Sequence, residues 1–503
     1  MQNASPPRLF SRLPALRSVI GARPLVRFGL LATPLLLAGC VVGPSFHGPK
    51  LAVPTAFLSP SRAAPAWPKP GWWRNFGSPE LDSLVEAAKL HNFSVIEAID
   101  QLEAANAQIE VSGSPLLPSI TGSGSGNFQQ AGTGAAGASS RSAFSQFGGV
   151  GSGKNSTTHS YSANFQASYE LDFWGKNYDA LRAAQANAAA AQFNAATVAL
   201  TEEASVATTY FQVLAYEDEL AIAHHNLDAA QGLLAQLKAE FKAGVVDEPT
   251  VAQQAALVAS ERATIPNLVS ELRQQALGLG ILTGKAPEFL RVKGGSLNDI
   301  VVPPLRPGLP AQLLERRPDV AEAEATLIGA NATVRGAFAS FFPSITLTGS
   351  GGWQSTALNT LFNPGSALLS AVSSLSQPIF EGGALTGTLD VDRATYREDV
   401  AKYEQAVVQA FTDVETAMTA LHYATDQEHL QQIAVQRAQA ALDGARAQLQ
   451  AGVVDVSTVL NAEETLLSDE NTLEQSRLTR LDAAVNLYKA MGGGWVLPKN
   501  EVR

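Results

Sequence analysis

A single proline-free stretch constrains this chain more than any other feature of its sequence. Residues 176–241 run for 66 positions with no proline and with one glycine, Gly232. Alanine, the strongest helix former, fills much of this stretch. At a rise of about 1.5 Å per residue, a helix of this length reaches roughly 100 Å. A compact domain does not need such a helix, so the sequence predicts an extended helical architecture.

Apolar residues recur every seven positions within this stretch. They form two columns, which correspond to the a and d positions of a coiled-coil seam. The first column is Val206, Val213, Leu220, Leu227, Leu234 and Phe241, and the second is Thr209, Tyr216, Ala223, Ala230 and Leu237. Small residues at d let neighbouring helices approach closely, so this helix is predicted to pack lengthwise against others.

The second half of the chain repeats this pattern. The sequence AGVVD follows the long stretch at residues 243–247 and returns 208 positions later at residues 451–455. The apolar columns also return before it, interrupted once by Glu428. Residues 116–126 (LLPSITGSGSG) match residues 341–351 (FFPSITLTGSG). The chain is therefore interpreted as a tandem duplication of one supersecondary unit.

The N-terminus has the pattern of a secretory signal. Residues 1–39 hold five arginines and no acidic residue, and they end in an apolar run that leads to Leu-Ala-Gly before Cys40. Cys40 is the only cysteine, so it has no disulfide partner within the chain. This junction resembles the lipobox of bacterial lipoproteins. The resemblance implies that Cys40 becomes the N-terminus and carries a diacylglycerol and an N-palmitoyl group. The alternative is an ordinary signal with an incidental cysteine.

The repeats and the signal divide the chain into segments. The expected order is a lipoprotein signal peptide at 1–39, an extended proline-rich tether at 40–78, a first repeat at 79–284, an equatorial linker at 285–317, a second repeat at 318–495 and a C-terminal tail at 496–503. The first repeat is predicted to contain a helix at 79–111, a β-hairpin at 115–172, a long helix at 176–242 and a return helix at 248–282 with a kink at Pro266. The second is predicted to contain a helix from 318, a β-hairpin at 343–380, a long helix at 383–450 and a return helix at 456–491.

Residues 160–171 alternate cleanly between apolar and polar side chains. Tyr161, Phe165, Tyr169 and Leu171 belong to the apolar set. This pattern fits a half-buried strand in water, and it also fits a membrane strand with Phe165 toward lipid and a polar face toward a wet lumen. Residues 344–353 alternate less regularly, and residues 368–377 do so poorly. Four strands of about ten residues are predicted, in two hairpins.

Four strands do not close a barrel. An open sheet edge in lipid leaves backbone groups unpaired, at several kcal/mol each. After the signal, no run of 18 apolar residues predicts a transmembrane helix. Two copies of the chain would give eight strands with a filled interior, and three would give twelve with a real lumen. The predicted fold class is mixed α+β, mostly α: a long antiparallel coiled-coil helical barrel below a trimeric 12-stranded transmembrane β-barrel.

The composition argues against several classes of function. With a formal net charge of −11, the chain is a poor candidate for binding nucleic acid. His224, His225, His422 and His429 lack partners at metal-ligand spacing and are expected to be solvated. No nucleophile–base constellation stands out, so an enzyme is not expected. No metal and no cofactor apart from the acyl groups is expected.

Several motifs together resemble a known family. They are LAGC at 37–40, LLERRPDVAEAE at 313–324, FFPSITLTG at 341–349, SQPIFEGG at 376–383, LYKAMGGGW at 487–495 and the two AGVVD turns. In these motifs the chain is similar to TolC-like outer-membrane efflux proteins, in the NodT-type lipoprotein subset that works with RND pumps. The charges at 315–319 (ERRPD) are interpreted as a structural cluster at the equatorial belt.

The resemblance implies a homotrimer in the outer-membrane lipid, with a helical tunnel across the periplasm. A periplasmic adaptor and an inner-membrane RND pump would complete the system, and the chain would be a passive duct for drugs or other small toxic compounds. One alternative is a type I secretion outlet for polypeptides. Another is a structural coiled-coil lipoprotein that links envelope layers, although such a linker has no use for a lipid-facing strand.

The resemblance also implies a narrowed periplasmic end near the AGVVD turns. Candidate residues there are Gly244, Asp247, Gly452, Asp455 and Asn461. Asn461 stands where the family commonly has aspartate, so an acidic ring would come from Asp455, Glu463, Asp247 or Glu248. The alternative for Asp247 and Asp455 is N-capping of the return helices, and the two roles are compatible. Glycine at the end of each long helix suits a helix C-terminus.

Overall fold

The computed structural model describes residues 42–46, 48–49, 51–58, 66–131, 156–305 and 307–497. The predicted signal peptide and Cys40 lie outside these residues, as do residues 132–155 of the predicted β-hairpin at 115–172. The expected fold class is confirmed, because the described chain is mostly helical, contains an antiparallel sheet and is built from a tandem repeat.

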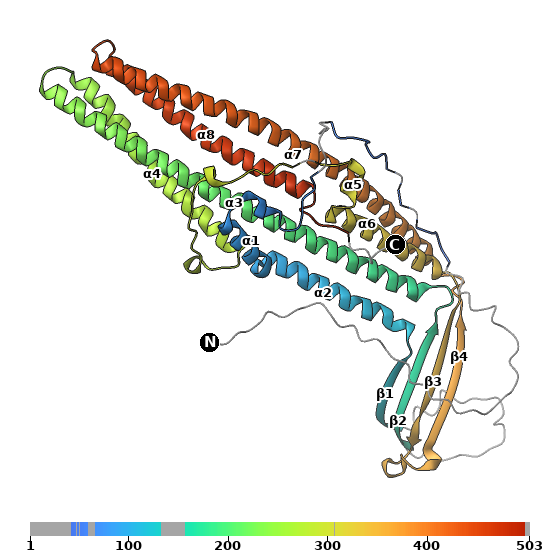
Figure 1. The fold of residues 1–503 in the computed structure, drawn as a ribbon. Coiled ribbons are helices and arrows are strands. Elements are labelled where there is room, and N and C mark those ends of the chain that lie inside the picture. Colours follow the sequence, from blue (N-terminus) through green and yellow to red (C-terminus); the bar gives the residue numbers. More distant parts are fainter. Residues whose placement is uncertain are drawn as a thin grey trace, which may run out of the picture. The chain divides into compact units, whose positions relative to one another are not determined.

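Two long antiparallel helical hairpins dominate the described structure (Figure 1). In the first hairpin α3 (Lys176–Lys242) is followed by α4 (Glu248–Leu282), and in the second α7 (Ala384–Gln450) is followed by α8 (Val456–Ala490). The two hairpins match in length, with 67 residues in α3 and α7 and 35 in α4 and α8. α4 is continuous through Pro266. This equality of length is what a duplication predicts.

Most of the seam predicted from the seven-residue period is buried or partly buried, but Phe241 at its end is 45% exposed. Its buried members on α3 are Val206, Val213, Ala223, Leu227, Ala230 and Leu237, and on α7 they are Val414, Ala417, Ala424, Ala438, Leu442 and Ala445. Many of them are alanine because small side chains let the helices of a hairpin approach closely. Among the described residues, no helix has both the length and the apolar character needed to cross a membrane.

Two helices replace the single helix expected at 79–111. α1 (Pro79–His91) ends at Asn92, and α2 (Phe93–Gly113) begins directly after it. The Asn92 side-chain oxygen accepts hydrogen bonds from two backbone N–H groups of the first turn of α2, at 2.8 Å and 3.2 Å. Its amide donates to the carbonyl of Leu282 at 2.9 Å, at the end of α4. The expectation was wrong because this capping competes with continuation of the helix.

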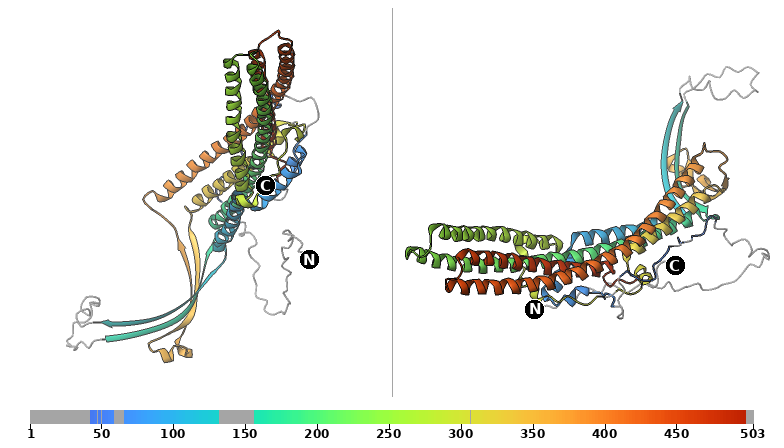
Figure 2. Two further views of the ribbon diagram at one scale, coloured as in Figure 1. Left: turned by 90° about the vertical axis from the view of Figure 1, so that its left-hand side faces the viewer. Right: turned by 90° about the horizontal axis from the view of Figure 1, so that it is seen from above.

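Shorter helices surround the long ones. α6 (Pro318–Ala339) lies between the N-terminal parts of α3 and α7, and α2 also contacts α3 (Figures 1 and 2). α5 (Pro310–Leu314), which belongs to the predicted linker, contacts α7. Short 3₁₀ helices are η1 (Trp72–Phe76), η2 (Ser114–Leu116), η4 (Pro287–Phe289), η5 (Leu297–Asp299), η6 (Leu358–Thr360) and η7 (Pro364–Ser366).

The predicted tether at 40–78 is not extended throughout. Its helix η1 is buried in the main core, between α3 and α8. The ring of Trp72 stacks on Tyr488 with 4.9 Å between centroids, and the ring of Phe76 lies 5.2 Å from that of Phe211. An extended chain was the wrong prediction for this part, because burying large aromatic side chains stabilises a compact turn there.

The strands form one antiparallel sheet in the order β1-β2-β3-β4 within the described residues. They are β1 (Ser119–Ala131), β2 (Ser156–Leu171), β3 (Ser344–Ser355) and β4 (Ala367–Ser376). β2 and β3 come from different repeats and pair with each other along most of their length. The two predicted hairpins are therefore joined side by side into a single sheet.

Candidate functional site: a two-faced sheet and two helical tips

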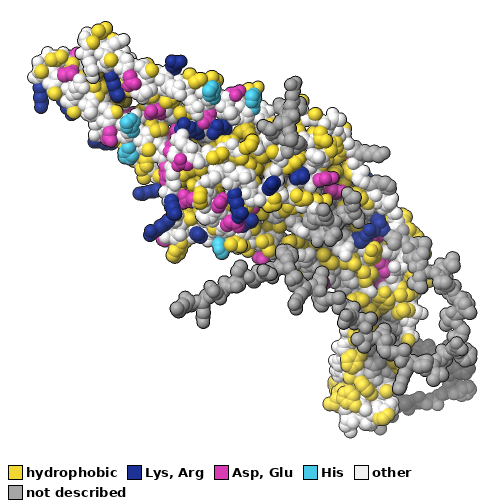
Figure 3. Space-filling model, viewed as in Figure 1, with side chains coloured by type: hydrophobic (Ala, Val, Ile, Leu, Met, Phe, Trp, Pro, Cys, Tyr) yellow, Lys and Arg dark blue, Asp and Glu magenta, His cyan; other side chains and the backbone are white. Residues whose placement is uncertain are grey.

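One face of the sheet is apolar. Side chains of directly paired residues share a face, so Phe165 of β2 lies on the same side as its partners Gly122 and Gly351. This apolar face includes Ile120, Phe128, Tyr161, Phe165, Tyr169, Leu171, Ile345, Leu347, Trp353, Leu369 and Leu375. Phe165 is 63% exposed and Leu369 is 90% exposed. Figure 3 shows hydrophobic side chains over the sheet, whereas charged side chains gather over the helices.

The opposite face is polar. Its members include Ser123, Ser125, Asn127, Ser160, Ser162, Asn164, Gln166, Thr346, Thr348, Ser350, Gln354, Ser370 and Ser374. The hydroxyls of Ser125 and Ser162 lie 2.8 Å apart on this face. Leu368 and Val372 of β4 are exceptions, because the register places both among the polar residues. Conversely, Ser373 is paired with Leu347 and lies on the apolar face. These three residues account for the poor alternation of residues 368–377.

The two outer strands leave open edges. β1 and β4 have one neighbouring strand each within the described chain, so each carries a row of backbone N–H and C=O groups without a strand partner. Glu170 is the one Asp, Glu, Lys or Arg among the residues of the four described strands. A sheet with one apolar face, one hydroxyl-lined face and almost no charge is suited to separate lipid from water.

Both long helices end in the same turn, and these turns, at residues 243–247 and 451–455, are called the tips below. Gly244 and Gly452 have φ angles of 73° and 74°, where a side chain would be strained. Asp247 and Asp455 follow as the N-caps of α4 and α8. Each carboxylate accepts a hydrogen bond from the backbone N–H three residues further on, at 3.2 Å and 3.3 Å. Hydrogen bonds from nearby hydroxyl and amide groups lower the pKa of both carboxyls.

The other residues predicted to narrow the duct lie just beyond the tips. Asn461 is exposed on α8, and Glu248 is exposed at the start of α4. Glu463 is different, because its carboxylate accepts a hydrogen bond from the guanidinium of Arg446 on α7 at 2.8 Å. The carboxylates of Glu248, Asp247 and Asp455 remain at the surface of the protomer, whereas that of Glu463 is neutralised within the second hairpin.

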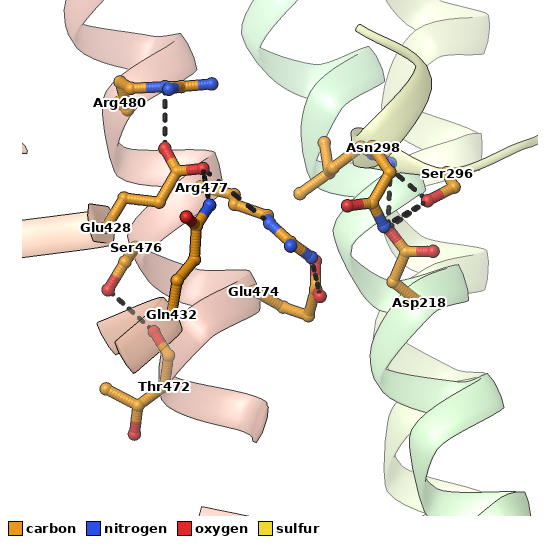
Figure 4. A network of polar contacts seen from close by, with 11 residues as sticks. Asp218, Ser296, Asn298, Glu428, Gln432, Thr472, Glu474, Ser476, Arg477 and Arg480 are labelled. Carbon is orange, nitrogen blue, oxygen red and sulfur yellow. Dashed lines mark hydrogen bonds and ion pairs between the residues drawn. The ribbon is translucent and has the colours of Figure 1, made fainter. Parts of the chain in front are cut away.

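A network of charged side chains surrounds Glu428, the residue that interrupts the apolar seam of α7 (Figure 4). Glu428 is 4% exposed, and its Oε2 lies 2.7 Å from Nε of Arg480 on α8. Its Oε1 lies 3.8 Å from Nε of Arg477 and accepts a hydrogen bond from Gln432 at 3.2 Å. Arg477 also pairs with Glu474 on α8. The buried carboxylate is therefore compensated by two guanidinium groups of the neighbouring helix.

On the side of the first hairpin, the network lies near Asp218 of α3. The Asp218 carboxylate accepts hydrogen bonds from the backbone of Leu297 at 2.8 Å and the hydroxyl of Ser296 at 3.1 Å (Figure 4). Burial raises the pKa of Asp218, and its hydrogen bonds and the charge of Arg477 oppose that shift. Burial also raises the pKa of Glu474, to about 7. The sequence marked Glu428 only as an interruption. Two arginines three residues apart on α8 were the signal that could have revealed its partners.

The charges predicted at the equatorial belt are structural. Arg317 precedes α6 and is buried, with ion pairs of 2.6 Å to Asp319 and 2.9 Å to Asp413. It also donates a hydrogen bond to the carbonyl of Ala490 at 3.3 Å. Arg317 therefore connects the start of α6 to α7 and to the end of α8.

The four histidines of the long helices, His224, His225, His422 and His429, are exposed. Across the part of the chain that the structure describes, no three His, Cys, Asp or Glu side chains are grouped so as to hold a metal ion.

Comparisons with known proteins agree with this architecture. The model of the outer membrane efflux protein family matches residues 84–285 and 309–493, which cover most of both repeats. The chain therefore belongs to the outer membrane efflux protein family.

Several relatives and solved structures resemble the chain over nearly its whole length. It is 35% identical to the pyoverdine export outer membrane protein OpmQ of Pseudomonas aeruginosa, over 93% of this chain and 96% of OpmQ. It is 31% identical to the cation efflux system protein CusC of Escherichia coli, over 92% of this chain and 97% of CusC. The open-state outer membrane channel MtrE of Neisseria gonorrhoeae matches with a TM-score of 0.79 at 28% identity, over 90% of this chain and 98% of MtrE.

The function and location implied by the resemblance are therefore confirmed. The protein is an outer-membrane channel component of an efflux system and extends into the periplasm.

Proposed function

We propose that three copies of this chain pair their sheets edge to edge into one twelve-stranded transmembrane barrel. The two-faced sheet with two open edges carries this proposal. In lipid, unpaired edge groups cost several kcal/mol each, and pairing β1 of one copy with β4 of the next removes that cost. The apolar face then contacts lipid, and the hydroxyl-lined face surrounds a water-filled lumen.

The helical hairpins extend this lumen into a periplasmic tunnel. α3 begins a few residues after β2 and α7 a few residues after β4, and each then runs for 67 residues. At about 1.5 Å per residue, the tips lie roughly 100 Å from the start of each helix. The tips are therefore the periplasmic end, where a periplasmic adaptor docks and brings an inner-membrane RND pump to the duct.

The duct is passive and carries small compounds. OpmQ is named for pyoverdine export and CusC for cation efflux, and neither name refers to a polypeptide. This favours drugs or other small toxic compounds over the polypeptides of a type I secretion outlet. A structural linker between envelope layers has no use for an apolar, lipid-facing sheet. Neither enzymatic activity nor a cofactor other than covalent lipid belongs to this proposal.

The glycine of the second tip tests the tip assignment. Gly452→Pro replaces a positive φ of 74° with the negative φ that proline imposes, so the turn cannot form. The barrel lies at the other end of α7, so we expect an intact trimer that no longer crosslinks to its adaptor and no longer confers drug resistance. Gly452→Asn is the matched control, because asparagine tolerates this conformation. Normal crosslinking to the adaptor and normal drug resistance in Gly452→Pro would show that the tips are not the docking site.

Cys40 is proposed as the lipid attachment site on the sequence of its junction alone, since it lies outside the described residues. Cys40→Ser is expected to abolish metabolic labelling with palmitate. The trimer should still reach the outer membrane, because the barrel provides its own anchorage. Persistent labelling of the variant would refute acylation at this residue.

A further inference from the structure

A cavity lies between the two helical hairpins, about midway between the tips and the network around Glu428. It has a volume of about 130 Å³ and is lined by residues of α3, α4, α7 and α8. An engineered apolar cavity of about 150 Å³ is large enough to bind benzene. The cavity therefore has room for one aromatic ring or a comparable aliphatic group.

One nearly buried glutamate of the lining has no side-chain partner in the described part of the chain. Glu261 of α4 lines the cavity and is 7% exposed. Among the residues that the structure describes, none forms a hydrogen bond or an ion pair with the Glu261 carboxylate. Burial raises its pKa, and the charge of Glu464 on α8 raises it further. Glu464 also lines the cavity and is exposed at its rim. Two carboxylates from different hairpins thus contribute negative charge with no cation between them.

The remaining charged groups of the lining do not supply that cation. Arg446 donates to Glu463 at 2.8 Å, so its charge is already paired within the second hairpin. Glu470 accepts a hydrogen bond from the side chain of Asn226 at 3.4 Å. His225 is exposed at the rim. Apolar contacts are supplied by Leu257, Leu442, Leu466 and Leu467.

We propose that this cavity binds a small primary ammonium compound with an apolar body, such as an arylalkyl amine. The ammonium group donates charge-assisted hydrogen bonds to Glu261 and Glu464, and the apolar body packs against the leucines. A divalent metal fits less well, since within the described chain the metal-ligating side chains are not grouped in threes.

A bound amine would join the two hairpins. Glu261 belongs to the first hairpin and Glu464 to the second, so an ammonium between them opposes their separation. This inference goes beyond the proposed export function, because it concerns a site in the wall of the helical part and does not depend on what passes through the duct.

Binding can be measured on the full-length protein in a neutral detergent, with 4-fluorobenzylamine observed by fluorine NMR. We expect saturable binding of this amine and none of 4-fluorobenzyl alcohol, which has the same shape without the charge. Glu261→Gln and Glu464→Gln should each weaken binding by about tenfold or more, since each replaces a charged acceptor of the ammonium with a neutral amide oxygen. The second variant lies at the exposed rim, where folding is not at risk. Glu271→Gln, on α4 but outside the cavity, is the control and should bind normally.

Any one of three results would overturn the proposal. The first is equal binding of the amine and the alcohol, and the second is unchanged amine binding in both glutamine variants. Absence of amine binding to the unaltered protein would overturn it as well. Drug resistance is measured for the same variants to distinguish this site from the proposed duct. Resistance should stay normal, because loss of the amine site leaves export intact.

Discussion

At one position of α7 the seven-residue period requires an apolar side chain, and the chain has Glu428 instead. A buried carboxylate without a partner would be strongly destabilising. Here its charge is opposed by Arg480 at 2.7 Å and by Arg477 at 3.8 Å. These contacts offset the desolvation of the carboxylate, and they fix the register of α7 against α8 at the level where Asp218 of α3 approaches.

Removing the carboxylate alone should therefore destabilise the protein, although leucine suits the seam. Glu428→Leu leaves the half-buried guanidinium of Arg480 without its ion-pair partner, whereas Arg477 keeps Glu474. Breaking a buried ion pair in this way costs about 3–5 kcal/mol. We expect a lower midpoint of thermal unfolding, measured by circular dichroism on the detergent-solubilised channel.

A compensating variant provides the control for this prediction. Glu428→Leu combined with Arg480→Met removes the closest ion pair, leaves Arg477 paired with Glu474 and should recover most of the lost stability, because buried ion pairs are often replaced by apolar groups without loss. A single variant as stable as the unaltered protein would mean that the network has no structural role.

Single residues were the least predictable part of the fold. N-capping by Asp247 and Asp455 could be read from the sequence, because an acidic residue directly before a helix is a local signal. The break at Asn92 was missed, since its side chain depends partly on Leu282, 190 positions away. The partners of Glu428 were missed as well, because they come from another helix. The spacing of Arg477 and Arg480 was a signal, but nothing near Glu428 in the sequence points to them.

At the scale of elements, the two faces of the sheet differ in what they tolerate. Phe165 and Gln166 are neighbours on β2 and point to opposite faces, Phe165 with the apolar residues and Gln166 with the polar ones. Phe165→Arg would place a charge in lipid, at about 2–4 kcal/mol near the bilayer midplane. We expect less assembled trimer in isolated outer membranes, measured on semi-native gels.

Gln166→Arg introduces the same charge one residue further on and serves as the matched control. Its side chain faces the proposed lumen, so trimer assembly should be nearly normal. If both variants assembled equally well, the assignment of the faces to lipid and water would be wrong.

Elements whose apolar pattern repeats regularly over many residues were the easiest to predict. The columns of α3 and α7 follow directly from their seven-residue spacing, and their burial confirms that interpretation. β2 was recognisable for the same reason, because every second residue is apolar. β4 was less clear, since Leu368 and Val372 sit on its polar face. The sequence has no signal for the pairing of β2 with β3, which depends on how the two repeats pack.

At the scale of the whole molecule, several buried carboxyls link stability to pH. Burial is the main cause that raises the pKa of Glu203, Glu474 and Asp482, each to about 7. The folded protein therefore binds more protons than the unfolded chain between the ordinary carboxyl pKa near 4 and about 7. Stability from these groups is fully present below that window and is lost as pH rises through 7.

We therefore expect a higher midpoint of thermal unfolding at pH 5 than at pH 8. Asp482→Asn should reduce this difference, because it removes one of the three titrating groups. Each unit by which folding raises the pKa of a group corresponds to about 1.4 kcal/mol of unfolding free energy. Asp390→Asn changes an exposed side chain of α7 and should leave the difference as it was. Unfolding midpoints that rise toward pH 8 would contradict the conclusion that folding raises the pKa of these buried carboxyls.

The pairing of β2 with β3 also sets the order in which the chain can fold. Tyr161 of β2 is paired with Ser355 of β3, 194 positions later, whereas β1 and β2 belong to the same repeat. After export, the first helical hairpin can form without the second repeat, since its contacts lie within the first repeat. The β2–β3 pairing forms only once residues up to Ser355 have also crossed the inner membrane, and in the proposed trimer the outer edges stay unpaired until neighbouring copies meet. During that interval apolar strands with unpaired edges are exposed to water, which makes this period of biogenesis the one most prone to aggregation.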